Sequence, residues 1–118
     1  MKVTLAALVA AVLLGAPIGL AQGQQAEPDP KLVEAGKKLY ADKGCVKCHQ
    51  IDGQGNRMSP LDGVASKLTK EDLRMWLTNP EEMMAKLPRR PVMRMPKVEL
   101  EPAELDALVA YLQTLKAK

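Results

Sequence analysis

Residues 45–49, Cys-Val-Lys-Cys-His, restrict the fold of this chain more than any other feature of its sequence. Cys45 and Cys48 are the two cysteines in 118 residues, and His49 is the one histidine. The chain also has one tryptophan, two tyrosines and no phenylalanine, which makes a thin core for a small domain. Domains of this kind usually gain stability from a disulfide, a metal or an embedded cofactor, so this motif is the first place to look.

Four kinds of site can use these three side chains. A disulfide between Cys45 and Cys48 closes a very small ring and adds little stability. A thiol redox centre favours a cysteine pair at a helix N-terminus after a strand, and a structural zinc site needs a fourth ligand. Covalent haem uses every residue, because both cysteines form thioethers to the vinyl groups and His49 becomes the fifth iron ligand. We therefore expect one covalent c-type haem held by Cys45, Cys48 and His49.

The first 21 residues have the pattern of an export signal. One lysine precedes a long apolar run, and Gly19, Leu20 and Ala21 form a small-x-small cleavage pattern. We expect cleavage after Ala21 and a periplasmic or otherwise extracytoplasmic protein. The alternative is an uncleaved N-terminal membrane anchor, because the run is just long enough to span a bilayer. Residues 22–29 are polar and proline-containing, so we expect a flexible leader there and a single folded domain over residues 30–118.

The domain has the apolar periodicity of helices. Asp29 and Pro30 suit the cap and first position of a helix that includes Leu39 and Tyr40. Thr69 is expected to begin a second helix by accepting a hydrogen bond from the backbone of Asp72. That helix should stop at residues 79–80, Asn-Pro, with a short further turn after it.

The last predicted helix begins near Pro102. Leucine and valine side chains form one stripe along it, with Glu104 in its first turn and Lys116 in its last, where both charges suit the helix dipole. No segment shows sustained alternation of apolar and polar residues between turn signals. We therefore predict an all-α fold.

Beyond the Cys-Val-Lys-Cys-His motif, the chain resembles the class I monohaem cytochromes c of bacteria over about residues 30–116. The stretch EAGKKLYADKGC is similar to the first helix of that family. The resemblance implies a small cytochrome c fold, with helices packed around one covalently attached haem. It also implies that Gly36 and Tyr40 cross the terminal helix at Leu108 and Tyr111.

Two further stretches resemble the family's axial-ligand segments. SPLDGVASKLT is similar to the loop whose proline, here Pro60, is expected to orient His49 through its carbonyl. MRMPKVELEPAELDALVAYLQTL is similar to the ligand loop and final helix, in which a methionine before a proline binds the iron. This methionine is Met95, which precedes Pro96.

The residues alone leave the sixth iron ligand open among methionines, a lysine, water or no ligand, because the chain has no second histidine. Met58 lies too near His49 in sequence to reach the opposite haem face easily. The methionines at positions 75, 83 and 84 fall in or beside helix patterns, where packing explains them. Met95 is the predicted ligand because Pro96 stiffens an extended loop, and Met93 is the alternative.

Histidine and methionine ligation leaves the iron without a vacant position, so we expect an electron carrier that is not an enzyme. The carrier would shuttle single electrons between redox partner proteins. The alternative is a haem c subunit of a larger complex such as a sulfur-compound dehydrogenase. A ligand-binding haem protein would follow if Met95 were labile.

The charge distribution points to protein partners. The net charge is only +3, but residues 86–97 carry five basic side chains and no acidic one. Lys43 and Lys47 flank the first cysteine of the motif. We expect both basic segments to dock to an acidic partner surface near the haem edge, and the alternative is a solvated loop. Nucleic acid binding is not expected, because the sequence has no basic helix face and the protein is predicted to be exported.

Overall fold

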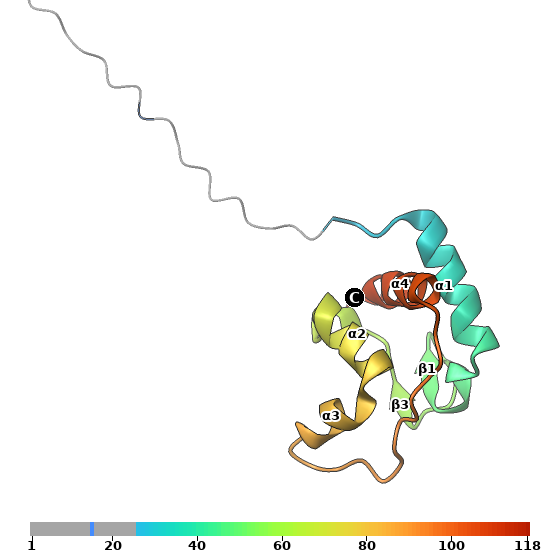
Figure 1. Ribbon diagram of the computed structural model, residues 1–118, viewed down its shortest axis with the longest axis vertical. Helices are drawn as coiled ribbons and strands as arrows, with labels where there is room; N and C mark the ends of the chain where they lie inside the picture. The colour runs from blue at the N-terminus through green and yellow to red at the C-terminus, as the bar shows by residue number, and fades with distance from the viewer. Residues whose placement is uncertain (1–14, 16–25) are drawn as a thin grey trace, which may run out of the picture.

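A computed structural model describes Gly15 and residues 26–118 (Figure 1). The predicted export signal apart from Gly15, and residues 22–25 of the predicted leader, lie outside the described residues. Within the described part, no helix is long and apolar enough to cross a membrane. The helices of this part are α1 (Pro30–Asp42), η1 (Cys45–Lys47), η2 (Val64–Ser66), α2 (Lys70–Thr78), α3 (Pro80–Ala85) and α4 (Pro102–Gln113), where η marks a single 3-10 turn.

The predicted helix starts are confirmed by hydrogen bonds at the caps. The Asp29 carboxylate accepts from the Lys31 backbone N–H at 2.8 Å, directly before Pro30 begins α1. Thr69 and Asp72 form a reciprocal capping box at the start of α2, with N–H to oxygen distances of 3.0 and 3.1 Å. These local contacts satisfy amides that have no partner inside the helix.

Helices α1 and α4 cross closely at the right of Figure 1, in the upper part of the folded domain. A Cβ atom added at Gly36 would meet the Ala107 carbonyl group and lie 2.7 Å from Tyr111 Cβ, so only glycine permits this approach. The rings of Tyr40 and Tyr111 meet edge to face with centroids 5.8 Å apart. Leu108 is 1% exposed at the same crossing. The predicted crossing of the first and last helices is therefore confirmed.

The core joins the helix crossing to α2 and to the segment after the cysteines. Its buried members are Tyr40, Ile51, Leu73, Leu77, Leu108, Val109 and Leu112. Partly buried side chains that pack against this cluster include Cys45, Met95 and Leu100. The cysteine motif and the predicted ligand loop thus share one hydrophobic core, although 50 positions separate Cys45 from Met95.

The prediction of a strictly all-α fold is wrong in one respect, because a small sheet follows the cysteine motif. Its strands are β1 (His49–Ile51), β2 (Gln54–Gly55) and β3 (Ser59–Pro60), in the order β2-β1-β3. A two-residue turn with positive φ at Asp52 (48°) and Gly53 (77°) joins β1 to antiparallel β2. Strands of two or three residues are too short to show the alternation by which a sequence reveals a sheet.

The predicted position of Lys116 in the last turn of α4 is also wrong, because α4 ends at Gln113. The tail after it packs against η2: Ala65 N–H donates to the Leu115 carbonyl at 2.9 Å, and Ala117 N–H donates to Ser66 Oγ at 2.8 Å. These long-range bonds hold the tail against η2 beyond the helix end.

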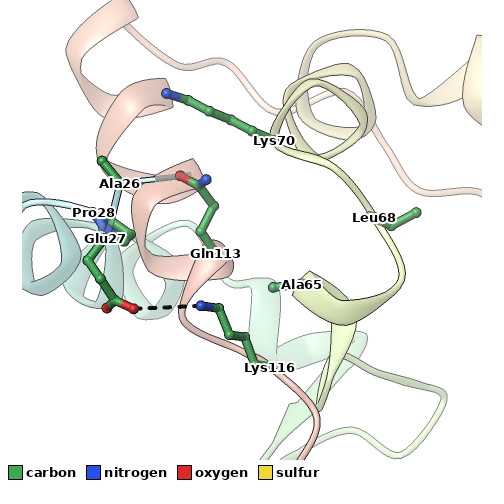
Figure 2. Close-up of a pocket in the computed structure, with 8 residues that line it drawn as sticks. All are labelled: Ala26, Glu27, Pro28, Ala65, Leu68, Lys70, Gln113 and Lys116. Atoms are coloured by element: carbon green, nitrogen blue, oxygen red, sulfur yellow. Dashed lines mark ion pairs between the residues drawn. The ribbon is translucent and has the colours of Figure 1, made fainter. Parts of the chain in front are cut away.

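The residues before α1 lie against this same tail. Glu27 and Lys116 form an ion pair at 3.7 Å beside a small pocket of about 40 Å³ (Figure 2). Both side chains are mostly exposed, so the pair adds little stability. The pocket is also small compared with cofactor sites, which occupy about 300–1,000 Å³.

Candidate functional site

The cysteine motif begins where α1 ends. Lys43 caps α1, Gly44 adopts a left-handed conformation with φ of 75°, and η1 then starts at Cys45. Cys45 and Cys48 are free thiols, both half-buried. Cys48 caps the 3-10 turn and β1 begins at His49, so the motif runs from the end of a helix into the sheet.

His49 is oriented by a hydrogen bond across the sheet. Its ring Nδ1 lies 2.8 Å from the Ser59 carbonyl oxygen. A carbonyl oxygen can only accept, so Nδ1 carries the proton and the neutral ring keeps a free lone pair on Nε2. This is the tautomer that a metal-binding imidazole needs, with its second nitrogen fixed by an outer partner.

The prediction that the Pro60 carbonyl orients His49 is therefore wrong, because the carbonyl that accepts from the His49 ring belongs to Ser59. In the parallel pairing of β1 with β3, His49 faces Ser59, whereas Pro60 faces Gln50. The Ser59 N–H donates to the Cys48 carbonyl at 3.1 Å, which fixes the Ser59 peptide beside the histidine. Sequence reasoning missed Ser59 because the register of such short strands leaves no pattern in the sequence.

The backbone of His49 is held as firmly as its ring. Its carbonyl accepts from the Asn56 N–H at 3.1 Å and from the Tyr40 hydroxyl at 3.3 Å. Gly55, at φ of 100°, passes so close that an added Cβ atom would clash with the same carbonyl. Burial raises the pKa of Tyr40 to about 12, so its hydroxyl stays protonated as a donor at neutral pH.

The environment of Cys45 differs from that of a reactive redox thiol. Burial raises the pKa of its thiol, whereas redox-active cysteines depend on a lowered pKa. Among residues 26–118, no group of three or more histidine, cysteine and acidic side chains comes together as a metal site of those donors requires. The donor set fits the two thioether links and single imidazole of a c-type haem.

The two loop methionines differ in burial. Met95 is half-buried and packs against the core cluster, as Cys45 does. Met93 is 53% exposed, as is Met58. Met83 and Met84 are buried within α3. Of the two loop methionines, Met95 is the one that contacts the core on which the cysteine motif also packs.

A cleft of about 390 Å³ lies beside Met95, which is within the range of about 300–1,000 Å³ typical of cofactor sites. Its walls come from the junction of α2 and α3 and from the loop around Met95. Cys45, Cys48 and His49 do not line this cleft. The core thus brings the cysteine motif and Met95 into one region, but a single cavity does not enclose both.

Residues 86–97, which we call the basic loop, carry less free positive charge in the structure than their sequence indicates, because two of their cations form ion pairs. Lys86 pairs with Glu82 at 2.9 Å, and Arg94 pairs with Glu81 at 3.7 Å. Both acids belong to α3, so they precede residues 86–97 in the sequence. The Glu82–Lys86 pair was readable as an i,i+4 spacing, whereas the contact between Arg94 and Glu81 depends on how the loop folds back.

Comparison with known proteins agrees with this site. The family model for cytochrome c matches residues 33–116. Cytochrome c oxidase subunit 2 of Alkalihalophilus pseudofirmus is 25% identical over 101 residues, which cover 76% of this chain. The aligned part is only 28% of the length of that relative. From its motif, its fold and this family match, the chain belongs to the cytochrome c family, whose members bind covalent haem c with iron.

Proposed function

We propose that this protein is a one-electron carrier outside the cytoplasm, with a single haem c attached through Cys45 and Cys48 and ligated by His49 and Met95. The observation that carries the proposal is the hydrogen bond from His49 Nδ1 to the Ser59 carbonyl. It leaves Nε2 available to ligate iron, and His49 directly follows the second of two free cysteines in the C-x-x-C-H spacing.

Each residue has a defined part in this function. When bound, the haem supplies reversible exchange of one electron between ferrous and ferric iron. Ser59 holds the imidazole in one tautomer, and the hydroxyl of Tyr40 holds the His49 backbone. The Met95 thioether would close the sixth position and favour the ferrous state, which suits an electron carrier better than an enzyme that activates a substrate.

Export supports the same function. Residues 1–21 have the composition of a cleavable signal, and c-type haem carriers that exchange electrons outside the cytoplasm need one. Cleavage would leave a free carrier. Retention of the segment would instead keep the haem domain close to the outer face of the membrane.

Docking to an acidic partner is part of the proposal, with a narrower set of residues than the sequence indicated. Within the described residues, Arg89, Arg90, Lys97 and Lys47 make no ion pair, whereas Arg94 and Lys86 do. The positive charge of an unpaired cation is not offset by a neighbouring carboxylate, so it attracts an approaching acidic protein more strongly. A solvated loop without a partner is the alternative.

A second candidate function is an electron-transfer unit within a larger complex. The similarity to cytochrome c oxidase subunit 2 favours an oxidase-type assembly over the sulfur-compound dehydrogenase suggested by sequence reasoning. Purification of the native protein under mild conditions tests this. A stable, stoichiometric larger chain would support the subunit, and a monomeric haem protein would support the free carrier.

The decisive experiment is an optical spectrum of the purified native protein in alkaline pyridine after reduction. We expect the absorption of a haem whose two vinyl groups are saturated, with one haem per chain after acid and organic extraction. Haem that extracts freely, or no haem at all, would refute the covalent site. Rapid binding of carbon monoxide to the ferrous protein would show an open iron position and refute closed ligation.

A further inference from the structure

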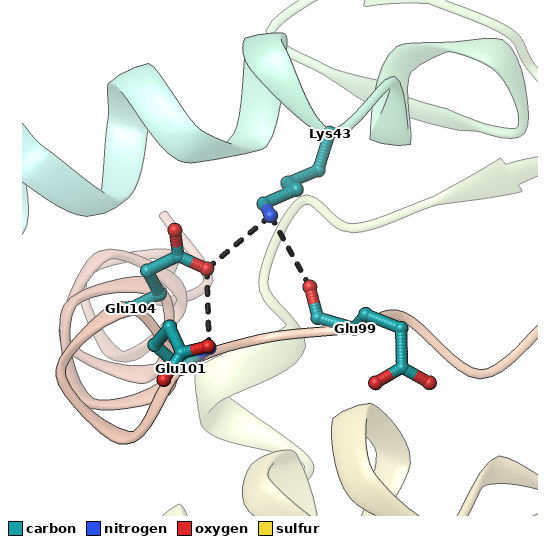
Figure 3. Close-up of polar contacts among 4 residues, drawn as sticks. All are labelled: Lys43, Glu99, Glu101 and Glu104. Atoms are coloured by element: carbon teal, nitrogen blue, oxygen red, sulfur yellow. Dashed lines mark hydrogen bonds and ion pairs between the residues drawn. The ribbon is translucent and has the colours of Figure 1, made fainter.

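Lys43 lies at an unusual junction in the fold, two residues before Cys45. Its Nζ is 3.2 Å from the Glu104 carboxylate of α4 and 3.2 Å from the backbone carbonyl of Glu99 (Figure 3). The lysine and Glu104 side chains are 30% and 33% exposed, so the pair is partly shielded from water. One ammonium group therefore joins the end of α1 to two separate parts of the C-terminal segment.

Glu104 is itself held in place within this arrangement. Its carboxylate accepts from the Glu101 N–H at 3.2 Å, as part of the capping box that begins α4. The pKa of Glu104 is lowered chiefly by the hydrogen bond from the Glu101 N–H and next by the one from Lys43, so Glu104 is charged at neutral pH.

The loop between α3 and α4 has few other polar anchors. Within residues 26–118, the hydrogen bond from Lys43 to Glu99 is the one that ties positions 88–100 to the rest of the fold. The Arg94–Glu81 pair also reaches this loop, but its atoms are 3.7 Å apart and its side chains are 71% and 79% exposed. Such exposed pairs contribute little. The remaining restraint is the packing of Met95 and Leu100 on the core.

We propose that Lys43 is a positioning residue, which couples the haem attachment motif to the loop that carries Met95 by holding Glu99 and Glu104. This inference rests on the proposed ligation of the iron by Met95. Glu99 is four residues beyond Met95, so fixing its carbonyl limits how far the loop can move from the core. Lys43 is then a structural cation, whereas Lys47, which makes no ion pair among the described residues, stays free for docking.

The test uses the ferric holoprotein with Lys43→Gln and, as the matched control, Lys47→Gln. Two signals are followed in guanidinium chloride: the weak red charge-transfer band of sulfur-ligated iron, which reports Met95, and the far-ultraviolet circular dichroism of the helices. In Lys43→Gln we expect the band to disappear at a clearly lower denaturant concentration than the helical signal. Extrapolated to water, the ratio of molecules that have lost the charge-transfer band to molecules that keep it should rise about three- to tenfold over that of the wild type. Lys43→Arg should restore most of the loss, because it keeps the charge.

Several results would overturn the proposal. If Lys43→Gln lowered the denaturation midpoints of the charge-transfer band and of the helical signal equally, Lys43 would support the whole fold and not the loop in particular. A Lys47→Gln shift as large as that of Lys43→Gln would mean that only the charge near the motif matters. If Lys43→Gln holoprotein does not accumulate, Glu104→Gln breaks the same pair from α4, and an unchanged band in that variant refutes the coupling.

The proposed function fails in a different and recognisable way. A wild-type protein with covalent haem but no red band, or with a band that survives Met95→Ala, refutes Met95 ligation and the Lys43 inference together. A wild-type band that depends on Met95 but is indifferent to Lys43 refutes the inference alone.

Discussion

At the scale of single residues, the site depends on how side chains are held as much as on which side chains are present. His49 is fixed on three sides: by Ser59 at its ring, and by Tyr40 and Asn56 at its carbonyl. Met95 has no hydrogen bond of this kind and is held by packing and by the stiff Pro96. The methionine is therefore the weaker of the two proposed ligand positions.

Met95→Ala is the prediction at this scale. It should abolish the red charge-transfer band, shift the ferric iron toward high spin or replacement ligation, and lower the reduction potential. The fall should be on the order of 100 mV, a fraction of the ~0.8 V range over which axial ligands tune haem. Absorption spectroscopy and potentiometric titration measure these effects.

Met93→Ala is the control, and it should leave the band and the potential nearly unchanged because Met93 is exposed. The reverse pattern, with the band lost in Met93→Ala and kept in Met95→Ala, would assign the ligand to Met93. An unchanged band in both variants would assign it to neither loop methionine.

At the scale of elements, the helices begin at polar caps that respond to pH. Two hydrogen bonds lower the pKa of Asp72 from its ordinary 3.8. The larger effect comes from the Thr69 N–H and the smaller one from the Thr69 hydroxyl. The lowered pKa means that the ionised carboxylate favours the folded state. This contribution is complete above the ordinary pKa and is lost as pH falls through the lower folded value.

Two changes at the α2 cap test this. Thr69→Ala should lower the free energy of unfolding by about 1 kcal/mol at neutral pH, as is typical for removal of a helix cap. Asp72→Asn should destabilise the protein at neutral pH and flatten its loss of stability below pH 3.8. Denaturant unfolding of the holoprotein at several pH values measures both effects.

Glu71→Gln in the same helical turn is the control, because Glu71 makes none of the capping hydrogen bonds. It should keep the slope of stability against pH in the acid range. The same slope in Asp72→Asn as in the wild type would contradict the role of the cap.

At the scale of the whole molecule, the fold separates basic residues that bind internally from those that are free to meet a partner. Lys43 is tied to α4 and the loop, and Lys86 and Arg94 are tied to α3. Arg89 and Arg90 are exposed and belong to the segment between α3 and α4, whose orange trace runs along the bottom of the fold in Figure 1. The docking surface should therefore depend on the unpaired cations, of which Arg89 and Arg90 are adjacent in the chain.

The prediction is that Arg89→Glu with Arg90→Glu slows oxidation of the ferrous protein by hexacyanoferrate(III), a small anionic acceptor that takes one electron. We expect about a tenfold slower rate at low ionic strength, vanishing at high salt, because exposed charges are screened within a Debye length. Stopped-flow absorption measures the rate, and the reduction potential should change little.

Lys37→Glu with Lys38→Glu gives the same change of charge on the exposed surface of α1 and is the matched control. Its rate should fall distinctly less. Equal slowing in both double variants would mean that net charge alone steers the anion, and that the basic loop is a solvated surface.

The local features of this protein were predictable from its sequence. The C-x-x-C-H motif specifies its chemistry through spacing alone. Helix starts at Asp29 and Thr69 depend on contacts within a few residues, so the pattern predicts them well. The family resemblance placed Gly36 at a helix crossing, and its position agrees with the cost of a glycine inside a helix, which close packing against another helix offsets.

Only the tertiary structure decided several other contacts between distant segments. The carbonyl on His49 belongs to Ser59 and not to Pro60, because a register shift of one residue in a strand pair exchanges the partners. The basic loop is partly neutralised by α3, and Lys43 reaches Glu99 and Glu104 across 56 and 61 positions of the chain. Such contacts depend on the packing of whole elements against one core, and no local pattern of residues records that packing.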